Sequence, residues 1–361
     1  VDFWTTPKRV FEPCCGKGGF VIDIVDRFMI GLAEHTPDET ERYRLIVEEC
    51  LYWADINPTN IFVCKLLLDP DNRFLLKFAE GDTLKLDIQA TWGFDQFDAV
   101  IGNPPYNASK SDVLIGGYGG RSLWDKFVVF CIDKCLINNG YLIFVHPPSW
   151  RKPEHYLWTK MSQENQMIYI KSYSKKEGLA LFKCATLADY YLMQKTPQHT
   201  ITIFDGQDGE RYEIDLSLWN FLPSGKINDI QKLLGIGQVI YSSSIYDTRR
   251  SWIIPLIKKE SKKSYYARCK ENNYTFPVIH NMTKEYGNGY VYSNEDKGHF
   301  SVKKVVLSFG EFQYPYNDFD GKYGMSQICF GIPINTHEEG EQLCEFIRSD
   351  TFKQILKYTK W

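Results

Sequence analysis

What the 361-residue sequence lacks excludes several classes of protein. No run approaches the roughly 18 consecutive apolar residues of a membrane-spanning helix, and no basic stretch followed by an apolar one opens the chain. Membrane and secretory proteins are therefore not expected. The ten cysteines include no C-x-x-C pair. This spacing argues against a metal site and predicts reduced thiols in a cytoplasmic protein, of a bacterial cell or of a cell that hosts a virus.

The most informative stretch follows an apolar, β-branched run at 97–101, which predicts a buried strand. The strand leads into Gly102-Asn103-Pro104-Pro105-Tyr106. The two prolines lack backbone donors and fix their own φ, so this loop should be stiff and extended. The amide oxygen of Asn103 and the carbonyl of Pro104 could accept both hydrogens of an exocyclic amino group, while Tyr106 stacks on its ring. An ordinary turn is the alternative, because Asn-Pro is common where strands end.

A glycine-rich turn comes earlier in the chain, between a short predicted strand at 9–12 and a helix expected to reach about residue 32. It reads Glu12-Pro13-Cys14-Cys15-Gly16-Lys17-Gly18-Gly19-Phe20. Glycines let a ligand approach the backbone closely. The spacing differs from the G-x-G-x-x-G of dinucleotide sites, and Glu12 would repel a pyrophosphate. The turn therefore favours a ligand with a cationic amino-acid part, such as S-adenosylmethionine.

Two acidic residues follow at the ends of further predicted strands. The segment 51–56 predicts a strand that ends at Asp55, the usual position of a carboxylate that binds ribose hydroxyls. The segment 74–79 predicts a third strand, followed by Asp82, which could reach an adenine amino group. Either aspartate could instead cap the next helix. Four such features at successive strand-to-helix turns indicate one ligand site at the edge of a parallel sheet.

This order of motifs resembles the amino-group DNA methyltransferases, specifically the adenine-N6 type whose target-recognition region lies at the carboxyl end. The resemblance covers roughly residues 7–195, and its most specific element is the 103–106 loop. It departs from the family upstream of the first strand, where only residues 1–7 stand in place of a longer cofactor-contacting segment. The resemblance implies S-adenosyl-L-methionine as the cofactor, contacted by Thr6, Glu12, Pro13, Cys14, Gly16, Gly18, Phe20, Asp55, Ile56, Asp82, Thr83 and Asn103.

The resemblance also implies the chemistry. An adenine in a duplex must leave the stack before its N6 can react, so base flipping is expected. The predicted catalytic residues are Asn103, Pro104, Pro105 and Tyr106. Tyr106 should stack on one face of the extruded base and Phe182, from a Phe-Lys-Cys-Ala-Thr segment at 182–186, on the other. A plain core position is the alternative for Phe182.

The expected fold class is α/β. Residues 1–200 alternate apolar strands with helix-length segments, which predicts a Rossmann-like S-adenosylmethionine-dependent methyltransferase domain. Residues 201–361 have short strands and turn signals, which predicts a smaller mixed α+β domain for target recognition. The stretch 338–358 carries an apolar stripe at helical spacing and predicts one terminal amphipathic helix.

The formal net charge of −3 is unusual for a DNA-binding protein, but it is unevenly distributed. Residues 1–150 carry a balance of −7 and residues 151–310 a balance of +7. The positive excess lies where a methyltransferase of this kind would contact phosphates, so double-stranded DNA is the expected partner. A solvated basic face is the alternative. The candidate DNA-binding residues are Arg249, Arg250, Lys303 and Lys304.

Two alternative functions remain open at this point. Methyltransferases that act on RNA or on a protein glutamine also use Asn-Pro-Pro-Tyr loops to hold planar nitrogens. A catalytically inactive nucleic-acid-binding module could retain the same scaffold. A cognate restriction endonuclease is a further possible partner. The sequence determines neither the oligomeric state nor the recognition site.

Overall fold

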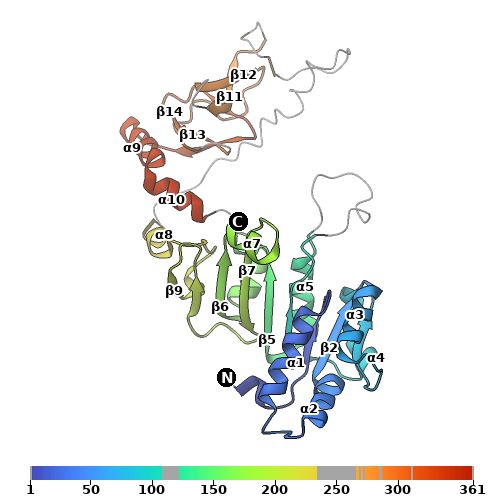
Figure 1. Ribbon diagram of the computed structural model, residues 1–361. Helices are drawn as coiled ribbons and strands as arrows, with labels where there is room; N and C mark the ends of the chain where they lie inside the picture. The colour runs from blue at the N-terminus through green and yellow to red at the C-terminus, as the bar shows by residue number, and fades with distance from the viewer. Residues whose placement is uncertain are drawn as a thin grey trace, which may run out of the picture. The chain divides into compact units, whose positions relative to one another are not determined.

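The computed structural model describes residues 2–107, 122–233, 266–267, 270, 273–283, 287–309 and 312–359. The chain forms two compact units, residues 1–227 and 228–360, and Figure 1 traces the elements of both. Arg249 and Arg250 lie outside the described residues. Within the described part, no helix is long and apolar enough to cross a membrane.

The first unit is built on a nine-stranded sheet in the order β3-β2-β1-β4-β5-β7-β6-β8-β9. Strands β1 to β5 pair in parallel, so their carboxyl ends meet at one edge. The β5–β7 and β6–β7 pairs are antiparallel. The strands are β1 Val10–Glu12, β2 Leu51–Asp55, β3 Lys77–Glu80, β4 Phe97–Gly102, β5 Leu136–His146, β6 Gln166–Tyr173, β7 Ala188–Gln194, β8 Thr202–Asp205 and β9 Arg211–Ile214.

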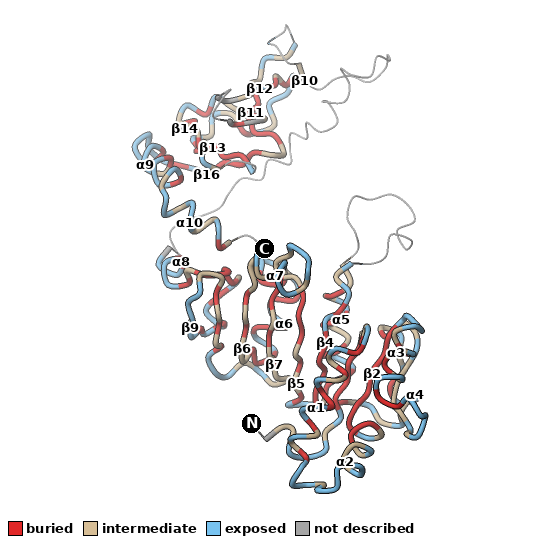
Figure 2. Tube along the Cα trace, viewed as in Figure 1, coloured by how far each residue is buried: buried red, intermediate tan, exposed pale blue. Residues whose placement is uncertain are grey.

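Helices alternate with the parallel strands, as the predicted α/β class requires. Strands β1 and β2 are buried along their whole length, and Figure 2 shows the strands as the most buried part of the unit. Such strands read as continuous apolar runs because helices cover both faces of the sheet. The helices are α1 Gly19–Gly31, α2 Glu39–Leu45, α3 Pro58–Leu68, α4 Ile88–Trp92, α5 Trp124–Phe130, α6 Leu157–Ser162 and α7 Lys175–Phe182. The fold class predicted for this region is confirmed.

The division between the units lies at residue 227 and not near residue 200. Strand β8 pairs with β6 in parallel, for example Tyr169 with Ile203, and β9 pairs with β8. The short, turn-separated strands after residue 200 therefore extend the large sheet. The next helix, α8, spans Ile227–Leu233 and crosses the boundary.

Among its described residues, the second unit holds two small sheets, the helices α9 and α10, and most of α8. One sheet has the order β10-β12-β11-β15 and the other β14-β13-β16. Smaller sheets in the carboxyl-terminal region agree with the predicted mixed class. The elements are β10 Tyr266–Ala267, β11 Phe276–Thr283, β12 Gly287–Ser293, β13 Lys304–Ser308, β14 Tyr316–Asp318, β15 Gly324–Met325, β16 Cys329–Pro333, α9 His337–Arg348 and α10 Asp350–Tyr358.

The single terminal helix predicted over 338–358 is wrong, because two helices occupy this stretch. Ser349 separates them with an extended backbone, φ −64 and ψ 154. Its side chain caps α10 by accepting a hydrogen bond from the Phe352 N–H at 3.2 Å. The apolar stripe still packs inward, since Cys344 and Ile347 belong to a core cluster with Val305.

Candidate active site

The predicted ligand-binding turns meet at the carboxyl edge of the parallel strands. The backbone N–H of Cys15 donates to the Ala54 carbonyl at 3.0 Å, which ties the glycine-rich turn to the end of β2. The hydroxyl of Thr83 donates to the Pro13 carbonyl at 2.7 Å, which ties the same turn to the segment after β3. Three segments that are far apart in sequence therefore form one continuous rim.

The glycine-rich turn depends on backbone conformations that favour glycine. Gly16 has φ +52 and Gly18 has φ +87, both in the left-handed region. A side chain at Gly18 would also lie 3.2 Å from Cys64 Sγ, on α3. Open space surrounds the position where Gly16 would carry a Cβ. The turn thus exposes backbone to a ligand at Gly16 and packs against α3 at Gly18.

Glu12, at the end of β1, is a buried carboxyl group with spare hydrogen-bonding capacity. Its Oε1 accepts a bond from the Cys14 N–H at 3.2 Å. Its Oε2 is buried and has no hydrogen-bond partner among the residues that the structure describes. Burial raises the pKa of Glu12 to about 8. Such a group would be stabilised by a ligand that brings a positive charge.

Gly102 explains how Glu12 fits between the strand ends. A Cβ at Gly102 would lie 2.7 Å from Glu12 Oε1, which is closer than two such atoms approach. The glycine that precedes Asn103 therefore makes room for the carboxyl group of Glu12. This contact joins the end of β1 directly to the start of the predicted catalytic loop.

Asp55 and Asp82 lie at the ends of neighbouring strands, as predicted. Asp55 accepts bonds from the Gly16 N–H at 2.9 Å and the Asn57 N–H at 2.8 Å. Each carboxylate oxygen has a second lone pair for a hydroxyl donor. Asp82 accepts a 3.2 Å bond from the Leu84 N–H and forms a 3.1 Å ion pair with Lys85. Asp82 also caps the short helical turn that follows it, which was the structural alternative, whereas α3 is capped by Asn57 and not by Asp55.

An open pocket of about 300 Å³ lies beside Asp82. Its lining includes Ala54 and Ala79, from β2 and β3, together with Gly81 and Thr83. Small side chains on adjacent strands leave room there for a flat group. Ile56, at the turn after Asp55, is 73% exposed, an uncommon state for a large apolar side chain.

The loop after β4 presents its polar groups outward. Asn103 and Pro105 are exposed, Pro104 is buried and Tyr106 is half-buried. The Leu123 N–H donates to the Tyr106 carbonyl at 3.1 Å, which connects the loop to the start of α5. The amide of Asn103 is thus available to a ligand on a backbone held at both ends.

Tyr106 also lies within electrostatic range of the segment that precedes β7. Burial raises the pKa of Tyr106 to about 12, and the Cys184 thiol and the Asp189 carboxyl add to the shift. Phe182 is half-buried, and its ring meets that of Tyr173 edge-on at 6.1 Å. Cys184, in the segment predicted to offer an aromatic face, is thus close enough to act on Tyr106 electrostatically, and the ring contact of Phe182 itself is with Tyr173.

The remaining predicted cofactor residues occupy different positions. Thr6 is exposed, whereas Pro13 is buried beside Glu12. Phe20 is half-buried against the main core cluster. Burial raises the pKa of Cys14 well above its usual value, so this residue is a neutral thiol and not a nucleophile.

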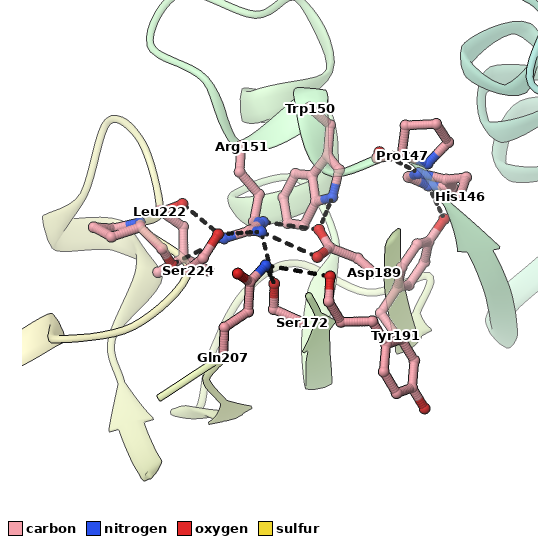
Figure 3. Close-up of polar contacts among 12 residues, drawn as sticks. His146, Pro147, Trp150, Arg151, Ser172, Asp189, Tyr191, Gln207, Leu222 and Ser224 are labelled. Carbon is pink, nitrogen blue, oxygen red and sulfur yellow. Dashed lines mark hydrogen bonds and ion pairs between the residues drawn. The ribbon is translucent and has the colours of Figure 1, made fainter. Parts of the chain in front are cut away.

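A buried polar network behind the catalytic loop was not predicted from the sequence. Arg151 and Asp189 are both fully buried and form an ion pair with Nε–Oδ2 at 2.8 Å and Nη2–Oδ1 at 3.1 Å. Trp150 Nε1 also donates to Asp189 at 2.9 Å. Figure 3 shows the guanidinium between Asp189 on one side and Leu222 and Ser224 on the other. The network fixes the start of β7 and the segment that leads toward the second unit.

The basic residues predicted to face DNA lie in different environments. Lys303 is exposed, with its ammonium 4.3 Å from the centre of the Phe319 ring. Lys304 is fully buried, and its Nζ bonds Asp318 Oδ2 at 2.7 Å and the His299 carbonyl at 2.9 Å. Lys303 lies just before β13, whose five residues are all buried, so Lys304 enters the core while Lys303 stays at the surface. Lys304 is therefore a core residue, and its prediction as a DNA-binding residue is wrong.

Residues 49–177 match the Eco57I restriction-modification methylase family. The matched segment, a little over a third of the chain, includes Asp55, Asp82 and the 103–106 loop. The predicted resemblance to amino-group DNA methyltransferases is confirmed for this segment, which matches a restriction-modification methylase. S-adenosylmethionine, the methyl donor of that family, is confirmed as the cofactor. No curated protein matches the chain.

Solved structures with detectable similarity are distant from this chain. The type IIL restriction-modification enzyme MmeI, in complex with DNA, shares 11% identity at a TM-score of 0.47. The match covers 95% of this chain and 58% of MmeI. The M protein of the type I restriction enzyme EcoKI shares 14% identity at a TM-score of 0.41, covering 56% of this chain and 45% of that one.

A type I restriction-modification methyltransferase subunit from Streptococcus thermophilus shares 14% identity at a TM-score of 0.37. The match covers 64% of this chain and 48% of the subunit. The chain thus spans about half the length of the solved structures that it matches.

Proposed function

We propose that this chain is the catalytic and target-recognition portion of a site-specific DNA methyltransferase that methylates the N6 of a flipped adenine. One observation carries the proposal. The Asn103-Pro104-Pro105-Tyr106 loop leaves the carboxyl end of β4 directly beside the buried carboxyl of Glu12, through the close packing of Gly102. The loop that could bind an amino group therefore lies next to Glu12, which could bind a cationic ligand.

The residues at the strand ends fit the cofactor. The free Oε2 of Glu12 can accept a bond from the cationic amino group of S-adenosylmethionine. Asp55 has lone pairs left for ribose hydroxyls. The pocket beside Asp82 and Thr83 can hold the flat adenine base of the cofactor. Ile56, the residue after Asp55, is exposed and can contact the cofactor as well. When bound, the cofactor supplies an electrophilic methyl group.

The protein's part in the reaction is positioning. The Asn103 side-chain oxygen and the Pro104 carbonyl accept the two N6 hydrogens of adenine, which turns the nitrogen lone pair toward the methyl donor. The proton can leave after the nitrogen has become cationic, so no general base is required before attack. Tyr106 stacks on one face of the base and Phe182 on the other. Preorganised acceptors of this kind lower the barrier mainly through orientation and electrostatics.

DNA is the proposed substrate, and Lys303 in the second unit is the described candidate for a phosphate contact. Arg249 and Arg250 remain candidates from the sequence alone. A cognate restriction endonuclease is a proposed partner, because the methylase segment matches a restriction-modification family.

The proposal is tested by methyl transfer in vitro. The full chain is incubated with radiolabelled S-adenosylmethionine and, in parallel, with duplex DNA, RNA and a protein extract. When the labelled DNA is digested to nucleosides, the label should be found in N6-methyl-2′-deoxyadenosine. Label in RNA or protein alone, label on cytosine, or cofactor binding without any transfer would each contradict the proposal.

A further inference from the structure

A series of stacked rings runs from the surface to the interior beside the catalytic loop. Tyr156 stacks on His155 with ring centres 5.0 Å apart, and His155 stacks on Trp124 at 6.0 Å. Trp124 in turn stacks on His146 at 4.3 Å. The three pairs are tilted by only 20° to 23°. The rings therefore form one nearly parallel column.

Exposure falls steadily along this column. Tyr156 is 61% exposed, His155 is half-buried, Trp124 is 4% exposed and His146 is fully buried. The inner end is anchored, because His146 Nδ1 donates to the Pro147 carbonyl and Nε2 accepts from the Tyr191 hydroxyl. Burial lowers the pKa of His146 to about 3, so this ring stays neutral. The column thus has a rigid base and an outermost ring open to solvent.

The outer ring is also held in place. The Tyr156 hydroxyl donates to Asp125 Oδ2 at 2.8 Å, which joins the first turn of α5 to the segment before α6. An exposed tyrosine would ordinarily sample several rotamers, and fixing it costs conformational entropy. Here the bond to Asp125 and the stacking on His155 restrain the ring. Its π face is therefore preorganised for a flat partner.

The column adjoins the catalytic loop. Trp124 follows Leu123, whose N–H donates to the Tyr106 carbonyl. His146 is the last residue of β5, the strand that pairs with β4 through Phe144 and Gly102. The column thus begins at the strand ends from which the catalytic loop leaves, and it reaches solvent at Tyr156.

We propose that Tyr156 is a stacking platform for a second DNA base, distinct from the flipped adenine. Lys152 and Lys126 are exposed, one in each of the two segments that the Tyr156–Asp125 bond joins, and can contact the phosphates of a nucleotide, although Glu154 is exposed in the same segment as Lys152. The Asp125 carboxylate keeps its negative charge when it accepts the tyrosine hydroxyl, so the ring itself favours an uncharged base over a phosphate. Stacking on an aromatic ring tolerates any base. The inference rests on the proposed function, since it needs DNA at the catalytic loop.

Three variants of the full chain test the platform. Tyr156→Ala removes the ring, and Tyr156→Phe keeps the ring but loses the bond to Asp125. Phe62→Ala, on α3, is a matched control because Phe62 is also an aromatic residue that is 59% exposed. The probe is a duplex bearing the motif found by sequencing methylated DNA, with 2-aminopurine, whose fluorescence stacking quenches, placed in turn at each base beside the target.

We expect Tyr156→Ala to weaken duplex binding roughly tenfold and to restore fluorescence at one flanking position. Tyr156→Phe should lose less than Tyr156→Ala, because it keeps the ring and loses only the bond that restrains it. Phe62→Ala should bind and quench like the unmodified chain, and cofactor affinity should be the same in all three. The platform would be overturned if Tyr156→Ala bound DNA like the unmodified chain, or if Tyr156→Ala and Tyr156→Phe lost equal affinity. Either result can occur while the unmodified chain still methylates DNA, so it leaves the proposed function intact. If the unmodified chain neither binds nor methylates duplex DNA, the proposed function fails and the platform fails with it.

Discussion

Two buried carboxyl groups of the first unit, Glu12 and Asp189, differ in how completely they are bonded. Asp189 receives bonds from both Arg151 and Trp150, so each of its oxygens has a partner. Glu12 has one bonded oxygen and one without a hydrogen-bond partner in the described structure. Buried polar groups are normally satisfied, and exceptions point to function. The difference separates a carboxyl group that holds the fold from one that binds the cofactor in the proposed function.

The largest predicted effect concerns the satisfied pair. Asp189→Asn should leave the Arg151 guanidinium buried without its counter-charge, which typically costs roughly 3–5 kcal/mol. Urea denaturation of the full chain measures the loss. Glu12→Gln is the matched control and should unfold at a urea concentration at or above that of the wild type. If both substitutions destabilised the chain equally, Glu12 and Asp189 would not differ in their contribution to the fold.

The sequence allowed prediction of this site only in part. Strand β4 and the loop that follows it from Asn103 were predictable because a β-branched run and two prolines fix the local conformation. The Arg151–Asp189 pair was not, because the partners are 38 positions apart and nothing local marks them. Lys304 was misassigned for the same reason. Its neighbour Lys303 suggested a solvated pair, whereas the counter-charge of Lys304, Asp318, lies on the adjacent strand.

The fold shows the same pattern. The α/β class followed from local apolar runs, and the starts of β2 and β4 were placed to the residue. The boundary near residue 200 differs from the structure because β8 joins the large sheet through a long-range pairing with β6. The break of the last helix at Ser349 depends on a single cap, which an amphipathic pattern conceals.

Asn103→Ala should have the next largest effect, on the reaction itself. Losing a hydrogen bond made to the target amine should cost roughly 3 kcal/mol, or about a hundredfold in methyl-transfer rate. Cofactor affinity, measured by calorimetry on the same sample, should fall far less than the rate, because the Asn103 side chain holds the target amine in the proposed function. Near-normal turnover would refute the assignment of the catalytic loop.

Asp55→Ala should weaken cofactor binding at least tenfold, because hydrogen bonds to charged groups contribute about 1.5–3 kcal/mol. Part of the loss would come from the Gly16 N–H, which also bonds this carboxylate. Asp55→Asn keeps an acceptor for that N–H and should show a smaller loss. Unchanged calorimetric affinity in both variants would leave Asp55 as a structural residue only.

Glu12 also predicts a pH dependence. Its pKa is about 8 in the folded chain and near the ordinary 4.5 when unfolded. The folded state therefore holds a proton that the unfolded state loses, and this contribution to stability is lost as pH rises from about 4.5 to about 8. A cationic ligand favours the ionised form, so cofactor affinity should rise over the same range. Stability and cofactor affinity are measured against pH for the wild type and for Glu12→Gln. If the two proteins gave the same profiles, Glu12 would not be the titrating group.

The smallest predicted effect lies in the second unit. Lys303→Ala should weaken binding to every duplex alike and reduce the salt slope by about one, as expected for one phosphate contact. Lys304→Ala should instead lower the urea midpoint, because it leaves Asp318 buried and unpaired. Binding across a salt series would contradict the assignment if Lys303→Ala kept the wild-type slope.

The most direct test of the central claim is sequencing of genomic DNA from cells that express the chain, with detection of modified bases. The account predicts N6-methyladenine at one short sequence motif with the wild-type chain and none with Asn103→Ala. Unmodified DNA from cells with folded wild-type protein, or methylation that persists with Asn103→Ala, would contradict it.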